Sequence, residues 1–121
     1  MADGSCLFCR IVAGEVPSTE VLRTERTYAF RDVDPAMPTH VLVVPITHID
    51  DAAAVTAEHA DLMAELLTTA RAVAEAEGLW SGDRQDRGYR LVFNVGPDAL
   101  NSVPHLHLHV LGGRTMTWPP G

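Results

Sequence analysis

The order of apolar and polar positions along the chain predicts short strands combined with two helices. Residues 6–13 place their apolar side chains at helical spacing and run into Gly14, which predicts a short amphipathic helix. Residues 21–23 and 27–33 are rich in β-branched and aromatic side chains and flank a polar step, a pattern typical of a hairpin. Residues 40–44 are apolar at nearly every position, so we expect a central strand that is covered on both faces.

One long segment has the strongest helical pattern in the chain. Thr56 suits the N-cap of a helix over residues 56–77, and Gly78 suits its left-handed end. Residues 89–95 and 105–111 predict two further strands. Strands that gather before and after one long helix, with short connections, indicate an antiparallel α+β domain. The apolar residues expected on one side of the long helix are Leu62, Met63, Leu66, Leu67, Ala70, Val73 and Ala74.

Length and charge narrow the function classes. The 121 residues include 16 acidic residues against 9 Lys plus Arg, a net charge of −7, and this length predicts one domain over residues 1–121. The charge disfavours binding to nucleic acid or to anionic membranes, which the surface would repel. The longest apolar stretch, residues 41–46, is far shorter than the ~20 residues that span a bilayer, and residues 1–4 lack a signal pattern. We therefore expect a soluble cytoplasmic protein.

The most informative segment has histidine at every second position. His105, His107 and His109 alternate with apolar residues. On a strand, alternate side chains share one face at a spacing of roughly 6.6 Å, so we expect the three imidazoles to line one face. Because neighbouring imidazolium charges repel each other, at least one of the rings should be neutral near pH 7.

Three interpretations of this histidine row compete. It can be an ordinary solvent-facing strand, although three histidines with this period are rare on such surfaces. It can be an open metal site, but no His-Glu-x-x-His helix or neighbouring carboxylate pair supplies a general base. The third interpretation is covalent catalysis, in which a neutral imidazole attacks an electrophile while a hydrogen bond holds its other nitrogen.

The residues before the histidines favour phosphorus as that electrophile. Asn94 ends one predicted strand, and Ser102 leads into the next. Each alone is more often a cap or a turn residue. A turn between them, however, would direct backbone amides, an amide side chain and a hydroxyl at one concave point. Such neutral donors suit an acidic chain that has no Gly-Lys-Ser/Thr phosphate-binding motif.

These features together resemble the histidine-triad family of nucleotide hydrolases and transferases. The alternating histidines match the family signature, and residues 102–114 and 118–121 resemble the Hint branch, the nucleoside phosphoramidases. The similarity covers nearly the whole chain. Further matching residues are Leu7, Phe8, Ala29, Phe30, Asp32, Val33, Pro38, Thr39, His40, Val44, Pro45, His48 and Ile49.

The resemblance implies a five-stranded antiparallel sheet with two helices, and a homodimer in which two sheets join into one ten-stranded sheet. The many apolar residues on the long helix agree with self-association. The resemblance also implies that His107 is the nucleophile and forms a nucleotidyl-histidine intermediate. The other implied catalytic residues are His109 on a phosphate oxygen, His105 and His40 supporting the site, Ser102 on the leaving amine and Asn94 on the phosphate.

The same resemblance implies a purine nucleotide as the ligand. Asp32 would bind the ribose hydroxyls, and Trp118, in a tail of residues 112–121, would border the active site of the other subunit. The purine would lie among Leu7, Phe8, Ile11, Val16, Phe30 and Val33, although these residues, taken alone, could equally be core. We therefore expect a purine nucleoside phosphoramidase. The alternatives are a dinucleoside polyphosphate hydrolase or nucleotidyl transferase, and a nucleotide-binding regulatory scaffold.

Cys6 and Cys9 leave two interpretations open. Their spacing suits a metal clip, and it also suits two reduced thiols on the first helix. In many relatives such a pair joins two histidines around a structural zinc, and the resemblance assigns those positions to His48 and His105. A closed set of two thiolates and two imidazoles is a sound zinc site. Catalysis itself is expected to need no cofactor.

Two places depart from the Hint pattern. Ala99 and Leu100 stand where that branch is usually rich in glycine, and Pro104 replaces an aromatic residue and removes one backbone donor. Both changes bear on the rate and on the preferred leaving group, and neither removes a reacting group.

Overall fold

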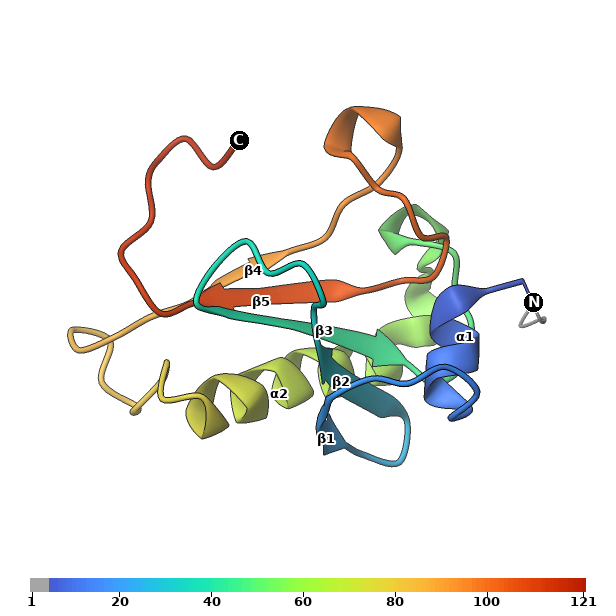
Figure 1. The fold of residues 1–121 in the computed structure, drawn as a ribbon, viewed down its shortest axis with the longest axis horizontal. Helices are drawn as coiled ribbons and strands as arrows, with labels where there is room; N and C mark the ends of the chain where they lie inside the picture. Colours follow the sequence, from blue (N-terminus) through green and yellow to red (C-terminus); the bar gives the residue numbers. More distant parts are fainter. Residues whose placement is uncertain (1–4) are drawn as a thin grey trace.

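The computed structural model describes residues 5–121, and at its centre lies a five-stranded antiparallel sheet in the order β1-β2-β3-β5-β4 (Figure 1). The α+β class with two α-helices is confirmed. The helices are α1 (Leu7–Val12) and α2 (Ala60–Ala76), and the strands are β1 (Glu20–Arg23), β2 (Thr27–Arg31), β3 (Thr39–Pro45), β4 (Arg90–Val92) and β5 (Leu108–Gly112).

The central strand β3 is covered on both faces, as its apolar run predicts. Val41 and Val43 belong to the core cluster that includes the inner residues of α2. Leu42 and Val44 point to the opposite face and pack in a second cluster with Phe8 of α1. Figure 1 shows α2 running along the sheet and α1 standing near the end of β3. The face under α1 is the one on which the functional residues collect.

The long helix begins later than predicted. Thr56 caps a short 3-10 turn, Ala57–His59, and α2 continues from that turn. Leu66 is fully buried against the sheet, whereas Leu67, predicted for the same face, is 48% exposed. Successive helical residues are about 100° apart, which places Leu67 at the margin of the buried stripe. Gly78 follows the helix with φ of 74°, the left-handed conformation expected of it.

The last two strands are shorter than predicted, and this changes the surroundings of the histidines. β5 begins only after His107, so the prediction that all three histidines line one strand face is wrong. His105 is fully buried rather than displayed. The reason lies in the backbone, because Pro104 has no N–H to donate and the Leu106 N–H donates at 2.6 Å to the carbonyl of Ile49, outside the ladder.

The ends of the chain bear on two further expectations. Residues 1–4, on which the expectation about a signal pattern rests, lie outside the described residues. Over the described residues, no helix combines the length and the apolar character that crossing a membrane requires. After β5 the chain leaves the sheet (Figure 1), and Trp118 in this tail is 80% exposed.

Candidate functional site

A pocket of about 460 Å³ opens beside α1, the end of β2 and the histidines. His107 and His109 line it, and the edge of the Phe8 ring packs against His107 with 5.0 Å between the ring centroids. The structure therefore brings together nearly all residues predicted to bind the nucleotide. Those that line the pocket are Leu7, Phe8, Ile11, Val16, Phe30, Asp32, Val33, Asn94 and Ser102.

Two predicted nucleotide-binding residues stand apart from the others. Trp118 does not line this pocket, and its ring lies instead 5.7 Å from the guanidinium carbon of Arg90. Val33 lines the pocket but is 96% exposed, so in the single chain it forms part of the rim. Sequence reasoning missed five lining residues that adjoin predicted ones or pack beside them, namely Pro17, Arg31, Leu42, Leu100 and Val103.

His107 is oriented by the backbone of the residue two positions before it. Its Nδ1 lies 2.7 Å from the carbonyl oxygen of His105. Because a carbonyl can only accept, this Nδ1 carries the hydrogen, and the neutral ring has its lone pair on Nε2. An imidazole held in this way has the form that a nucleophile requires.

His109 is held by a chain of hydrogen bonds that begins at a backbone amide. The Ala36 N–H donates to Nδ1 of His40 at 2.9 Å, so the hydrogen of the neutral His40 ring lies on Nε2. That Nε2 donates to Nδ1 of His109 at 2.8 Å. His109 in turn keeps its hydrogen on Nε2, which lies 3.4 Å from Nδ2 of Asn94 in the pocket wall; both atoms carry hydrogens, so they do not bond to each other and both are left to donate to a ligand. The chain of bonds thus sets His109 as a neutral donor.

The electrostatics of the site favour neutral rings. Burial, together with the neighbouring His107 and His40, lowers the pKa of His109 to about 4, although Asp32 acts in the opposite direction. Burial also lowers the pKa of His40, although the charge of Asp32 acts in the opposite direction. Asp32 is held in place because its Oδ1 accepts the Asp34 N–H at 2.8 Å. The site therefore offers neutral imidazole donors near pH 7 rather than a cluster of positive charges.

The turn between β4 and β5 carries the two predicted polar residues to the pocket. Asn94 and Ser102 both line it, as their positions at the two ends of this turn predict. Between them Leu100 adopts φ of 62° and is 86% exposed. This left-handed conformation favours glycine, and the turn adopts it here with leucine.

Cys6, Cys9, His48 and His105 form a second cluster whose ligand atoms all lie within 4.8 Å of one another. The free nitrogen of each ring is directed inward. Nε2 of His105 donates to the Pro45 carbonyl at 2.9 Å, and Nε2 of His48 donates to Asp50 at 2.8 Å. Both Nδ1 atoms therefore point toward the cluster.

The distances in this cluster match a tetrahedral zinc ion. The two Nδ1 atoms are 3.2 Å apart, and each pairing of a cysteine sulfur with Nδ1 of His105 measures 3.4 Å. Zinc with its usual bond lengths separates two nitrogen ligands by roughly 3.3 Å and a nitrogen from a sulfur by roughly 3.6 Å. The residues present thus fit a structural zinc ion. Sequence reasoning did not find Asp50, although a carboxylate two residues after His48 is a recognisable signal.

The chain is similar to several known proteins. A family model described as HIT domain matches residues 13–116. The chain is 41% identical to a 14 kDa zinc-binding protein of Zea mays, over 98% of this chain and 90% of that protein. It is 40% identical to Adenylylsulfatase HINT1 of Arabidopsis thaliana, over 99% of this chain and 79% of that protein. A crystal structure of a HIT family hydrolase from Legionella pneumophila Philadelphia 1 is 47% identical, with a TM-score of 0.89 over 97% of this chain and 100% of that one. The histidine pocket, the fold and these matches show that the chain belongs to the HIT (histidine-triad) family of nucleotide-binding hydrolases.

Proposed function

We propose that this protein is a purine nucleoside phosphoramidase, which hydrolyses the bond between a nucleoside 5′-monophosphate and an amine. The observation that carries the proposal is the orientation of His107. Its Nδ1 donates to the carbonyl of His105, which leaves the Nε2 lone pair available in a pocket with an apolar wall. This ring can form a covalent bond to phosphorus, and so divide one difficult hydrolysis into two displacements.

The first displacement forms the nucleotidyl-histidine. The lone pair of His107 Nε2 attacks phosphorus, the phosphorus–nitrogen bond to the amine breaks, and the amine takes up a proton as it leaves. We assign the delivery of this proton to the hydroxyl of Ser102, which lines the pocket. A donor in this position accelerates such a step by about 10²–10⁴-fold. In the second displacement, water attacks phosphorus and returns a proton to the Ser102 oxygen, the bond from phosphorus to Nε2 breaks with its electron pair returning to Nε2, and the nucleoside monophosphate is released.

Neutral donors would hold the phosphate during both steps. His109 presents its Nε2–H beside the amide of Asn94, and His40 keeps His109 in that tautomer. Hydrogen bonds from fixed neutral donors strengthen as negative charge develops on the phosphate oxygens. This arrangement also avoids placing several positive charges in one buried site.

The rest of the pocket would bind the nucleoside. Asp32 stands at the pocket wall with its carboxylate positioned to accept hydrogen bonds from ribose hydroxyls. The apolar side chains from α1 and β2, among them Phe8, Ile11 and Phe30, offer a surface for a purine ring.

We further propose that Cys6, Cys9, His48 and His105 are the ligands of a structural zinc ion. When bound, zinc would link α1 to the segment before β5 and would supply stability rather than take part in the reaction. Cysteines kept as thiols are typical of a reducing compartment, and this supports a location in the cytoplasm. His105 then serves His107 through its carbonyl alone.

We also propose a homodimer. β4 is an edge strand, so a two-fold axis can pair it with its copy and extend the sheet to ten strands. Leu67 and Leu91 are exposed apolar residues that such an assembly would cover. The tail of residues 112–121, including Trp118, would then reach the other subunit's pocket. Light scattering should give twice the chain mass, and a monomer mass would remove this part of the proposal.

A second candidate substrate is adenylyl sulfate. One relative carries the name adenylylsulfatase, and this substrate presents the same 5′-phosphoryl group to His107. Sulfate leaves without taking up a proton, so its hydrolysis should depend little on Ser102. A comparison of rates on an adenosine phosphoramidate, adenylyl sulfate and a diadenosine polyphosphate separates these reactions. Tight mononucleotide binding without turnover of any of them would instead favour a regulatory scaffold.

Replacement of His107 tests the proposed reaction. His107→Asn should lower turnover of an adenosine phosphoramidate by at least about 10³-fold, because the attacking nitrogen is lost. Mononucleotide binding and thermal stability should stay near wild type. His59→Asn serves as the matched control, since His59 does not line the pocket. Mass spectrometry of acid-quenched wild type should find one nucleotidyl group on His107, and turnover by His107→Asn at the wild-type rate would contradict the assignment.

A further inference from the structure

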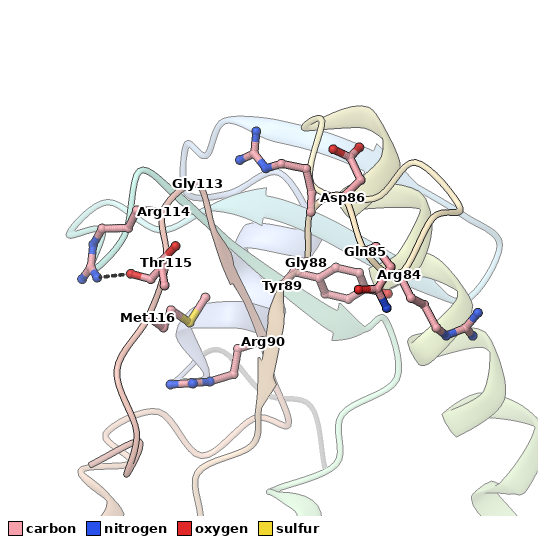
Figure 2. Close-up of a pocket in the computed structure, with 11 residues that line it drawn as sticks. Arg84, Gln85, Asp86, Gly88, Tyr89, Arg90, Gly113, Arg114, Thr115 and Met116 are labelled. Atoms are coloured by element: carbon pink, nitrogen blue, oxygen red, sulfur yellow. Dashed lines mark hydrogen bonds between the residues drawn. The ribbon is translucent and has the colours of Figure 1, made fainter.

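A second pocket, of about 610 Å³, lies at the other end of β4 and β5 from the histidines. Arg90 begins β4 and Gly113 directly follows β5, whereas His107 precedes β5. The polar loop before β4 and the segment after β5 form its walls (Figure 2). None of its lining residues also lines the nucleotide pocket. It is therefore a concavity separate from the nucleotide pocket of the same chain.

The charges of this pocket differ from those of the rest of the chain. All nine basic residues are arginines, and four of them, Arg84, Arg87, Arg90 and Arg114, line this pocket beside one acidic residue, Asp86. We call this site the arginine pocket. Within residues 5–121, none of these four forms a salt bridge with a carboxylate. Each of the other five arginines does form one, namely Arg10, Arg23, Arg26, Arg31 and Arg71.

Three of the four arginines, Arg84, Arg90 and Arg114, make contacts with aromatic rings or backbone carbonyls. Arg90 lies over the ring of Trp118 and donates to the Thr117 carbonyl at 3.2 Å. Arg114 donates to the Thr115 carbonyl at 3.1 Å. Arg84 lies 5.5 Å from the centroid of the Trp80 ring. Such contacts position a guanidinium but supply no full negative charge, and each guanidinium has five N–H donors. In Figure 2, Arg90 and Arg114 extend on one side of the pocket and Arg84 on the other.

We propose that the arginine pocket binds a small anion that carries several phosphate groups. Guanidinium groups pair with phosphate oxygens through two parallel hydrogen bonds, and several of them can share a multivalent anion. The hydroxyl of Thr115 and the amide of Gln85 add neutral donors in the same pocket. A concave site of this size suits a compact ligand. An extended nucleic acid would instead meet the net charge of −7 over the surrounding surface.

Calorimetric titration of the full chain with inorganic tripolyphosphate tests this site. Wild type should bind one tripolyphosphate per chain, more weakly as ionic strength rises. Arg87→Gln and Arg114→Gln should each weaken binding about tenfold, because each removes one charge-assisted contact. Both side chains are exposed, so the fold should tolerate the changes. Arg71→Gln is the matched control, because it removes an exposed arginine that is paired on α2, and it should leave the affinity within about twofold.

Two further arms distinguish the sources of the phosphate. Adenosine monophosphate in excess should not displace tripolyphosphate, since the two pockets are separate, and displacement would overturn the proposal. A single-stranded oligonucleotide should bind more weakly than tripolyphosphate, and tighter binding would identify a nucleic-acid surface instead. Absence of binding at low salt, or equal affinity in wild type and both arginine variants, would also overturn the proposal.

Discussion

This protein contains two clusters of titratable side chains, and the hydrogens of their histidine rings are arranged in opposite ways. One consists of Cys6, Cys9, His48 and His105, and the other of Asp32, His40 and His109. In each cluster the ligand atoms are near enough to share a cation. The distances between ligand atoms therefore do not tell the two clusters apart. The positions of the hydrogens do.

In the cysteine cluster, outer hydrogen bonds hold both hydrogens away from the centre. Pro45 and Asp50 accept from the Nε2 atoms, so both Nδ1 lone pairs face the two sulfurs. Four electron-pair donors directed at one point are satisfied by a metal ion.

In the second cluster, hydrogen bonds run from a backbone amide through His40 to His109, and we call this series the histidine chain. Its hydrogens are arranged in the opposite way. The Ala36 N–H donates to His40 and His40 donates to His109, which leaves the last hydrogen on Nε2 of His109, a residue that lines the pocket. This cluster is complete without a cation and is suited to hold an anion. The comparison teaches that backbone groups around a histidine decide whether it binds metal or substrate.

Removal of the zinc ion should cause the largest loss of stability, and it should disturb only the cysteine cluster. We expect one zinc ion per chain, and we expect chelation or Cys9→Ser to lower the free energy of unfolding by several kcal/mol, because the ion binds the folded chain alone. The midpoint of thermal unfolding should fall by more than about 10 °C. Elemental analysis and calorimetry measure both quantities.

The histidine chain supplies the control for that experiment. His109→Asn should retain the full zinc content, because His109 belongs to the other cluster. The protein should be prepared with zinc under reducing conditions. If it then holds no zinc, and if a chelator leaves the midpoint of thermal unfolding unchanged, the proposed difference between the two clusters is wrong.

A fall in pH should lower the stability of the protein through His109, with an effect of intermediate size. The pKa of His109 is lowered to about 4 by burial and by His107 and His40, with Asp32 opposing them. An unfolded histidine titrates near 6.5, so between pH 6.5 and 4 the unfolded chain binds a proton that the native ring does not. Stability from this group is complete above pH 6.5 and is lost as the pH falls toward 4, by at most about 3 kcal/mol.

Urea unfolding at several pH values measures this loss, and His109→Asn should flatten the curve between pH 6.5 and 4. The pKa can also be read directly from the His109 ring by nuclear magnetic resonance. A value above about 6 would show that the native ring accepts a proton readily, and the interpretation of His109 as a neutral donor would be wrong.

The contacts between residues could be predicted from the sequence. The orientation of each side chain was predicted far less well. Runs of β-branched, aromatic and apolar residues were sufficient for the sheet, and the strong 56–77 pattern was sufficient for the long helix, because burial fixes both. The histidine motif likewise identified the pocket. The burial of His105 could not be read from that motif, because it depends on Pro104 and on a hydrogen bond from Leu106 to the distant Ile49.

The positions of the hydrogens were also outside the reach of the sequence. They depend on the Ala36 amide and the Pro45 carbonyl, which every residue type can supply and which only the fold places. The arginine pocket was missed for a related reason. Its arginines are spread over residues 84–114, and their lack of carboxylate partners is visible only once the other five are paired.

The substitution with the smallest predicted effect is also the sharpest test of the comparison. It changes the tautomer of His109 and leaves the reacting groups in place. His40→Asn removes the donor that faces Nδ1 of His109 and leaves the His109 ring free to carry its hydrogen on either nitrogen. We expect turnover of an adenosine phosphoramidate to fall about 10–100-fold, in line with the loss of one buried hydrogen bond. The decrease should appear in kcat more than in KM, because the bond from His109 matters most when charge develops on the phosphate. Zinc content should be unchanged, and His40→Gln, whose amide is long enough to donate to the same nitrogen, should recover part of the rate. A loss confined to KM would mean that His40 shapes the pocket and does not set the tautomer of His109.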